Sequence, residues 1–277
     1  MMRCKHCNGE HPDDYKFCPV TGKELEQPLK ACSNPNCDNF EKSILPAQAK
    51  FCPRCGQMIA GDVLSPESGE TVFSVNGVEF EMVHVEGGSF DMGEEVNFSV
   101  PLHRVTLSSY HIGKYPVTQK LWEMVMGDNP STFKGPNRPV ESVSWDDCQR
   151  FISKLNRLTR KKFKLPTEAQ WEFAARGGNN SAGYGYSGSN DFYSVAWFEE
   201  NSGYETHDVG ELLPNELGIY EMSGNVFEWC SDEFDRCSAG AYPVRGGSFM
   251  FYHYWLGNQA YQNRIFRNEY TGFRLCL

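Results

Sequence analysis

The chain has 277 residues, 40% of them hydrophobic and 14% aromatic, which is enough for one large domain with a sizeable core and a small second module. The formal net charge of −10 is uneven, because residues 1–60 carry eight Lys/Arg against seven Asp/Glu and the rest carries eighteen against twenty-nine. An acidic main body argues against non-specific nucleic-acid binding. No apolar run is long enough to be a signal or to cross a bilayer, so we expect a cytoplasmic protein, or one that leaves the cytoplasm by a route this chain does not encode.

Seven of the eleven cysteines lie in the first 55 residues, which is typical of a metal-binding module. Two pairs are separated by fourteen residues, so each pair can grip one side of a tetrahedral Zn²⁺. Gly56 supplies the tight turn after the second pair. We therefore predict one zinc site made by Cys32, Cys37, Cys52 and Cys55.

The first cysteine unit is less regular, because Thr21 stands where a fourth cysteine is expected. His11 is the best substitute ligand and His6 the next, although a histidine here can also be a solvated loop residue. The predicted ligands of this second zinc are Cys4, Cys7, Cys18 and His11.

Both units resemble bacterial zinc ribbons, and segments this short need metal for most of their folding energy. We expect a double zinc-ribbon module over residues 1–60 that binds protein or acts as a spacer. A polar linker follows over 61–70, and the main domain spans 71–277. The other cysteines are expected to be buried. Spacing would permit a Cys230–Cys237 disulfide, but a reducing compartment disfavours it.

The main domain starts with extended elements. Residues 72–92 alternate as strands, with turns at Asn76-Gly77 and Gly87-Gly88, and residues 105–117 form another extended stretch. Thr118 can cap a short helix that continues to Met126.

Two further helices are predicted from their caps. Ser144 precedes a helix over 145–161 whose apolar face belongs to the core, and a capping box starting at Thr167 precedes a helix that ends at Gly177-Gly178. Glu168 and Glu172 share a face of this last helix, and we interpret them as fold-holding hydrogen-bond partners. The apolar face of the second helix consists of Trp145, Cys148, Phe151, Ile152, Leu155 and Leu158.

Loops dominate the rest of the domain. Residues 179–215 are rich in Gly, Ser, Asn and Tyr without periodicity, which is typical of a functional or pinned loop. Short strands are expected within 216–232, around Ser223-Gly224-Asn225. The sequence therefore predicts an α+β domain with few helices, short strands and long loops.

Several motifs in one order give this domain a resemblance to a known family. They are Phe90-Asp-Met-Gly93, Tyr115-Pro-Val-Thr118, Pro139-Val-Glu-Ser-Val-Ser-Trp145, Leu165-Pro-Thr-Glu-Ala-Gln-Trp-Glu-Phe-Ala-Ala-Arg176, Gly218-Ile-Tyr-Glu-Met-Ser-Gly-Asn-Val-Phe-Glu-Trp229, Arg245-Gly-Gly-Ser248 and Gly272-Phe-Arg274. Together they resemble the formylglycine-generating enzyme (sulfatase-modifying factor) superfamily over roughly residues 75–277. The resemblance implies a C-type-lectin-like fold.

The resemblance does not extend to the reactive groups of the family's enzymes. The oxidase branch binds copper through two cysteines whose places fall at or near Phe251 and Leu256, and no cysteine lies between Cys237 and Cys276. The iron-dependent branch needs clustered histidines, and the main domain has no close histidine pair. We therefore predict no catalytic residue and a protein that is not an enzyme. A metal-dependent oxidase and a structural accessory or oligomerisation protein are the alternatives.

The segment 245–277 carries the functional prediction. Aromatic and amide side chains alternate there, which suits a recognition surface because such rings give large contact areas at low entropic cost. An irregular core is the other interpretation. The segment resembles the diversified part of variable proteins of diversity-generating retroelements. A protein ligand is expected first and a glycan second. The predicted contacts are Phe249, Phe251, Tyr252, His253, Tyr254, Trp255, Tyr261, Asn263, Phe266, Asn268 and Tyr270.

Calcium is a further expectation from the resemblance, because relatives of this fold often bind Ca²⁺ in their long loops. Asn225 and Glu228 stand in the matching motif, and Asn201 lies in the loop before it. Oxygen ligands suit Ca²⁺, but each of these side chains can also serve only as a loop hydrogen-bond partner.

Overall fold

A computed structural model describes residues 2–3, 10–11, 70–93, 102–233, 240–252 and 256–277. The chain divides into two units, Met1–Glu67 and Ser68–Leu277, and the division lies within the predicted linker. In the first unit, β1 (Met2–Arg3) and β2 (Glu10–His11) form an antiparallel pair. The side chains of all predicted zinc ligands lie outside the described part, so both zinc sites stay predictions.

The second unit begins with a three-stranded antiparallel sheet in the order β3-β4-β7. Its members are β3 (Glu70–Val75), β4 (Val78–Val85) and β7 (Tyr110–Gly113). The predicted hairpin turn is confirmed, because Asn76 and Gly77 both have positive φ angles, of 48° and 85°. Two such residues match the twist of the flanking strands.

A second hairpin is formed by β5 (Gly88–Met92) and β6 (His103–Leu107). The single extended stretch expected over 105–117 is therefore wrong in detail. The chain pairs first with β5 through β6 and then with β4 through β7. Between the two strands, the Ser109 hydroxyl accepts a hydrogen bond of 3.0 Å from the backbone N–H of Gly87 and anchors the change of partner.

The first two helices confirm their predicted caps. The hydroxyl of Thr118 caps α1 (Gln119–Met126), and Ser144 forms a capping box with Asp147 at the start of α2 (Trp145–Thr159). Leu158 was expected in the core but is 52% exposed. The chain turns back after α2, and the buried ring of Phe163 takes part in the core instead. No helix within the described ranges is long and apolar enough to cross a membrane.

The third helix, α3 (Glu168–Ala175), begins with the predicted capping box and ends before Gly177, whose φ is 89°. The long loop after it contains two single-turn 3-10 helices, η1 (Gly178–Asn180) and η2 (Phe192–Ser194). Most of residues 179–215 are otherwise irregular, as the sequence predicted.

A second sheet, in the order β10-β9-β8-β11, carries the C-terminal segment. It consists of β8 (Phe227–Trp229), β9 (Ala241–Arg245), β10 (Ala260–Asn263) and β11 (Thr271–Gly272). Of the short strands expected within 216–232, the structure has β8. A Cβ atom on Gly272 would lie 2.3 Å from the Val140 carbonyl oxygen, so only glycine permits this close approach.

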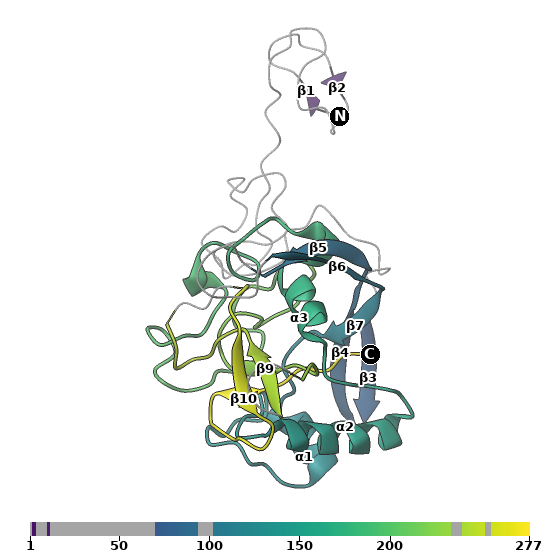
Figure 1. Ribbon diagram of the computed structural model, residues 1–277, viewed down its shortest axis with the longest axis vertical. Coiled ribbons are helices and arrows are strands. Elements are labelled where there is room, and N and C mark those ends of the chain that lie inside the picture. The colour runs from purple at the N-terminus through teal and green to yellow at the C-terminus, as the bar shows by residue number, and fades with distance from the viewer. Residues whose placement is uncertain (1, 4–9, 12–69, 94–101, 234–239, 253–255) are drawn as a thin grey trace. The chain divides into compact units, whose positions relative to one another are not determined.

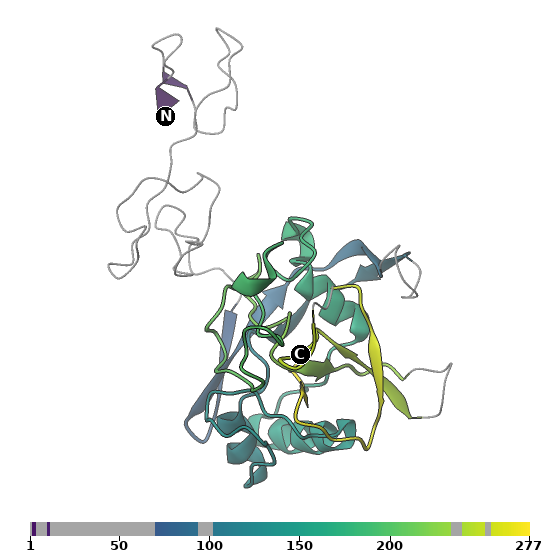
Figure 2. The ribbon, with the colours of Figure 1, turned by 90° about the vertical axis from the view of Figure 1, so that its left-hand side faces the viewer.

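The second unit places its helices and sheets around two large groups of buried side chains, and a smaller group lies within the long loop. Figures 1 and 2 show α1 and α2 along one end of the unit and the β5–β6 hairpin toward the other. The C-terminus lies between these two ends, beside β4 and β7 in Figure 1, and Cys276 bridges to both Ile112 and Lys164. The expected α+β architecture, with three helices among the described residues, is confirmed.

Candidate ligand-binding surface

Buried arginines hold both ends of the C-terminal segment. Arg245 ends β9 with its side chain fully buried, and it donates to the carboxylates of Glu168 at 2.8 Å and Glu172 at 2.7 Å. Burial disfavours its charge, but these two carboxylates outweigh that effect and raise the pKa of Arg245. The interpretation of Glu168 and Glu172 as fold-holding groups is confirmed.

At the other end, Arg274 follows β11 and is also fully buried. It donates to both oxygens of Glu228 at 2.6 Å and to the Gly113 carbonyl at 2.9 Å. Glu228 also accepts a hydrogen bond of 2.6 Å from the Trp171 indole. A buried charge that is paired in this way fixes the position of the backbone, because separating the pair would leave the partner uncompensated.

Residues 249–271, which we call the strip, run between these anchors. Phe249 was predicted to contact ligand, but it is fully buried and packs edge-on against Phe133 at 5.2 Å. Asn268 is also buried. Its side chain donates a hydrogen bond of 3.0 Å to Gln262 and accepts one of 3.1 Å from the Tyr270 N–H. Both therefore hold the backbone of the strip and are corrected from ligand contacts to structural residues.

Four predicted contacts have exposed side chains. Phe251 is 40%, Tyr252 59% and Phe266 49% exposed, and Asn263 is exposed as well. Ile265 was not among the predicted contacts, but it is 69% exposed beside Phe266. The sequence signal is an apolar pair, Ile265 and Phe266, placed between two arginines in a polar stretch.

The turn that displays Ile265 and Phe266 is tied to the first turn of α2. Arg264 donates to Asp146 at 2.9 and 2.6 Å, and Arg267 donates to Asp147 at 2.6 and 3.0 Å. Burial alone would raise the pKa of Asp147, but the hydrogen bonds from Arg267 and Ser144 outweigh it and lower the pKa to about 2.

Two other predicted contacts are half-buried. The Tyr261 hydroxyl donates 2.6 Å to Gln259, and the ring of Tyr270 lies 5.4 Å from that of Phe251. This ring contact brings the two ends of the strip together. His253, Tyr254 and Trp255 lie outside the described residues, so their part in binding stays a prediction.

The three residues named for calcium are engaged within the protein. Asn225 exchanges hydrogen bonds of 3.1 Å with the backbone of His207, and Asn201 bonds to the backbone of Phe198 and Ala196. Glu228 faces the guanidinium of Arg274. These contacts agree with the alternative interpretation, in which the three side chains are only hydrogen-bond partners within the loops. Calcium binding stays a prediction that these contacts do not favour.

The positions at which the oxidase branch carries its copper ligands have hydrocarbon side chains. Phe251 lies at the surface, and Leu256 is buried in the core near Trp171. Neither offers a donor atom, so the residues present do not fit the copper group of that branch. In the described ranges, no three His, Cys, Asp or Glu side chains are grouped as a metal would need. Cys230 is a buried free thiol, and Cys237 lies outside those ranges.

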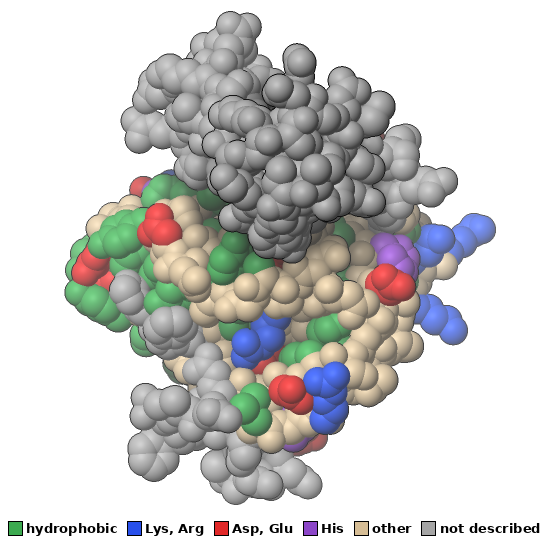
Figure 3. Space-filling view, turned by 90° about the horizontal axis from the view of Figure 1, so that it is seen from above, with side chains coloured by type: hydrophobic (Ala, Val, Ile, Leu, Met, Phe, Trp, Pro, Cys, Tyr) green, Lys and Arg blue, Asp and Glu red, His purple; other side chains and the backbone are tan. Residues whose placement is uncertain are grey.

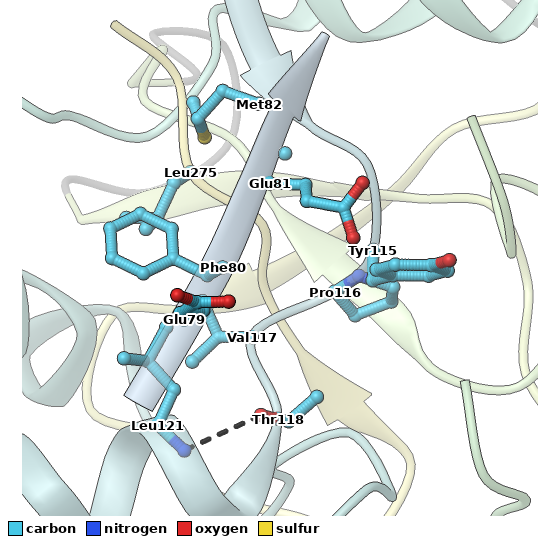
Figure 4. A pocket seen from close by; sticks show the side chains of 11 residues that line it. Glu79, Phe80, Glu81, Met82, Tyr115, Pro116, Val117, Thr118, Leu121 and Leu275 are labelled. Atoms are coloured by element: carbon cyan, nitrogen blue, oxygen red, sulfur yellow. Dashed lines mark hydrogen bonds between the residues drawn. The ribbon is translucent and has the colours of Figure 1, made fainter. Parts of the chain in front are cut away.

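A groove of about 110 Å³ lies away from the strip, between β4 and residues 113–118 (Figure 4). Phe80, Val117 and Leu121 contribute apolar surface, and Glu81 pairs with Lys114 at 2.7 Å. Pockets for small ligands usually measure roughly 300–1,000 Å³ and contain converging polar groups. This groove is smaller, which leaves the exposed strip as the stronger candidate for recognition.

The motifs, the two sheets and the buried arginine anchors together define a class of protein. Residues 71–277 match the family described as the sulfatase-modifying factor enzyme 1-like domain, and the chain belongs to that family. The chain is 37% identical over 222 residues to "Chaperone protein LppX" of Paenibacillus barcinonensis, an alignment that covers 62% of this chain and 76% of the relative.

Other relatives include enzymes and a protein of a different kind. A formylglycine-generating enzyme of Thermomonospora curvata is 34% identical over 125 residues, but the alignment spans 40% of this chain and only 39% of the enzyme. Among solved structures, Treponema denticola variable protein 1 is similar with a TM-score of 0.69 and 29% identity, over 75% of this chain and 98% of that one. This chain is therefore similar both to proteins named as formylglycine-generating enzymes and to a protein named as a variable protein.

Proposed function

We propose that residues 71–277 form a non-enzymatic ligand-binding domain of the variable-protein type, in which exposed residues of the strip contact a protein ligand. The observation that carries this proposal is that the strip contains two kinds of side chain, those that hold its backbone and those that are exposed. Phe249, Arg264, Arg267 and Asn268 make the fixed contacts, while side chains such as Tyr252, Ile265 and Phe266 face solvent. Exposed side chains that do not carry the fold can change without loss of structure.

Two further observations support a binding role over an oxidase. Phe251 and Leu256 offer no ligand to copper. The fold is similar to that of a variable protein over 98% of that protein's chain. The N-terminal module, with its predicted zinc ions, would serve as a spacer or as a second protein-binding element. On this proposal the ligand-binding face and the module act in one chain without a reactive centre.

The test compares proteins captured by the immobilised chain with those captured by a triple variant, Tyr252→Ser, Ile265→Ser and Phe266→Ser. We expect one or more partners to be lost from the triple variant, because rigid aromatic residues carry most of the binding energy at such interfaces. Direct titration of an identified partner should then show affinity reduced at least tenfold, roughly 1.4 kcal/mol or more.

Leu158→Ser is the matched control, since Leu158 is 52% exposed on α2 and lies outside the strip. Partners should be retained by this variant, and all variants should melt within a few degrees of the unchanged protein. Capture that survives the triple variant would contradict the proposal. A search for an adenine-rich near-copy of the segment encoding 245–277 tests the retroelement part separately.

A further inference from the structure

The beginning of the strip is joined to a loop that lies outside it in sequence. The Ser202 hydroxyl donates a hydrogen bond of 2.9 Å to the Phe249 carbonyl, and the Glu199 N–H donates one of 3.3 Å to the Phe251 carbonyl. The Tyr252 hydroxyl donates 2.5 Å to Glu200. Residues 191–204, which we call the scaffold loop, are therefore continuous with the exposed start of the strip.

This scaffold loop displays its own aromatic side chains. Tyr193 is 53% exposed and Tyr204 59% exposed, values close to the 59% of Tyr252. Beneath them, the loop is supported by a small buried cluster that includes Phe192 and Phe198. Three exposed tyrosines on supported backbone form an aromatic surface larger than isolated surface residues would give.

Two carboxylates lie among these tyrosines. Glu200 accepts hydrogen bonds from the hydroxyls of both Tyr193 and Tyr252, and Glu199 accepts one of 3.4 Å from Tyr204. The bond to Glu200 raises the pKa of both phenols, so they stay neutral donors. Figure 3 shows hydrophobic and acidic side chains gathered together at the left of the view.

This chemistry selects a positively charged partner. A guanidinium or ammonium group can pair with a carboxylate while it lies over the face of a tyrosine ring, and the two attractions reinforce each other. The acidic balance of residues 61–277, with eighteen basic against twenty-nine acidic side chains, attracts cations over a longer range. A neutral saccharide offers no charge that would match the carboxylates.

We infer that the scaffold loop and the start of the strip form one composite docking surface for a cationic segment of a protein partner. An Arg or Lys side chain would lie over Tyr193, Tyr204 or Tyr252 and pair with Glu199 or Glu200. This inference rests on the proposed function and adds a partner class to it. The loop lies outside the segment 245–277, so it would set a shared preference for basic partners, while the strip would choose among them.

The experiment uses the isotope-labelled full chain and NMR titration with acetyl-Gly-Arg-Gly-amide. The control probe is acetyl-Gly-citrulline-Gly-amide, which keeps the shape of arginine without its charge. We expect the arginine peptide to shift the amide signals of residues 193, 200, 204 and 252, with weaker shifts from citrulline. Glu200→Gln should weaken binding about two- to fivefold, the range expected for one exposed charge pair.

Three variants test where the peptide binds and what the Tyr252 ring contributes. Glu123→Gln removes an exposed carboxylate on α1 and should leave the affinity unchanged. Tyr252→Phe keeps the ring and should retain most binding, whereas Tyr252→Ala should not. Spectra that are otherwise unchanged in each variant show that the fold is intact.

Equal shifts from both peptides, shifts elsewhere, or unchanged affinity in Glu200→Gln would overturn the inference. Such a result would leave the proposed function standing if a captured partner still depended on the strip. Loss of strip-dependent capture, with arginine binding retained, would instead remove the proposed function and leave a cation-binding surface.

Discussion

Glu221 is a carboxylic acid in the interior, 5% exposed, close enough to Arg274 and Glu228 to interact electrostatically with both. Burial raises its pKa to about 8, although a hydrogen bond of 2.7 Å from the Gly210 N–H opposes the shift. Its second oxygen, Oε2, has no hydrogen-bond partner within the described ranges. With a pKa raised to about 8, we expect this carboxyl to be mostly protonated at neutral pH.

The effect on stability follows from linkage. In the unfolded chain Glu221 ionises near its ordinary value of about 4.5, whereas in the folded chain it keeps its proton until about pH 8. The folded state binds more protons in this window, so the free energy of unfolding should fall as pH rises from about 5 to 8. The total change contributed by this group is on the order of a few kcal/mol.

Glu221→Gln should remove most of this slope, because the amide is neutral at every pH and its oxygen can still accept from Gly210. Urea unfolding at pH 5, 6, 7 and 8 measures the effect, and the variant should gain stability relative to the unchanged protein at pH 8. Glu123→Gln, on the exposed face of α1, serves as the control. Parallel pH profiles for Glu221→Gln and the unchanged protein would show the carboxyl to be ionised when folded.

At the scale of elements, the strip combines two kinds of residue within a few positions. Phe249 is buried against Phe133, whereas Tyr252, three residues later, is 59% exposed. The change occurs where the chain leaves the interior, after the two positive-φ glycines Gly246 and Gly247. Only three positions therefore separate a buried side chain from an exposed one, and stability measurements can tell them apart.

Phe249→Ala should lower the free energy of unfolding by about 3–5 kcal/mol, because it leaves a cavity in a packed interior. Tyr252→Ala should change it by no more than about 0.5–1 kcal/mol, since the ring is mostly in solvent and loses one exposed hydrogen bond to Glu200. Chemical denaturation of both variants checks the contrast. A loss of several kcal/mol in Tyr252→Ala would favour the interpretation of the strip as core.

Much of the element order was predictable from local chemistry. The caps at Thr118, Ser144 and Thr167 each satisfy helix N–H groups through neighbouring residues, so the sequence alone indicates them. The burial of Phe249 and Asn268 was not predictable, because it depends on Phe133 and Gln262, which reach them only through the fold. For the same reason, the contacts between the scaffold loop and the strip left no pattern in the sequence.

At the scale of the whole molecule, the two units differ in what can stabilise them. Residues 68–277 enclose two large groups of buried side chains, a smaller one, and two buried arginine–carboxylate networks. The first unit, Met1–Glu67, is short and carries seven cysteines, which favours metal over a hydrophobic core as its source of stability. The units should therefore respond differently when metal is removed.

Metal analysis of the purified full chain should find about two zinc ions, one for each predicted ribbon. Cys52→Ser should reduce this to about one, because a tetrahedral site loses a thiolate, and a fragment of residues 68–277 should contain none. Chelation should release the zinc and expose the N-terminal unit to protease, while the thermal unfolding of the fragment stays unchanged. Zinc retained by the fragment, or an unaltered zinc content in Cys52→Ser, would contradict the assignment of the metal to the N-terminal cysteines.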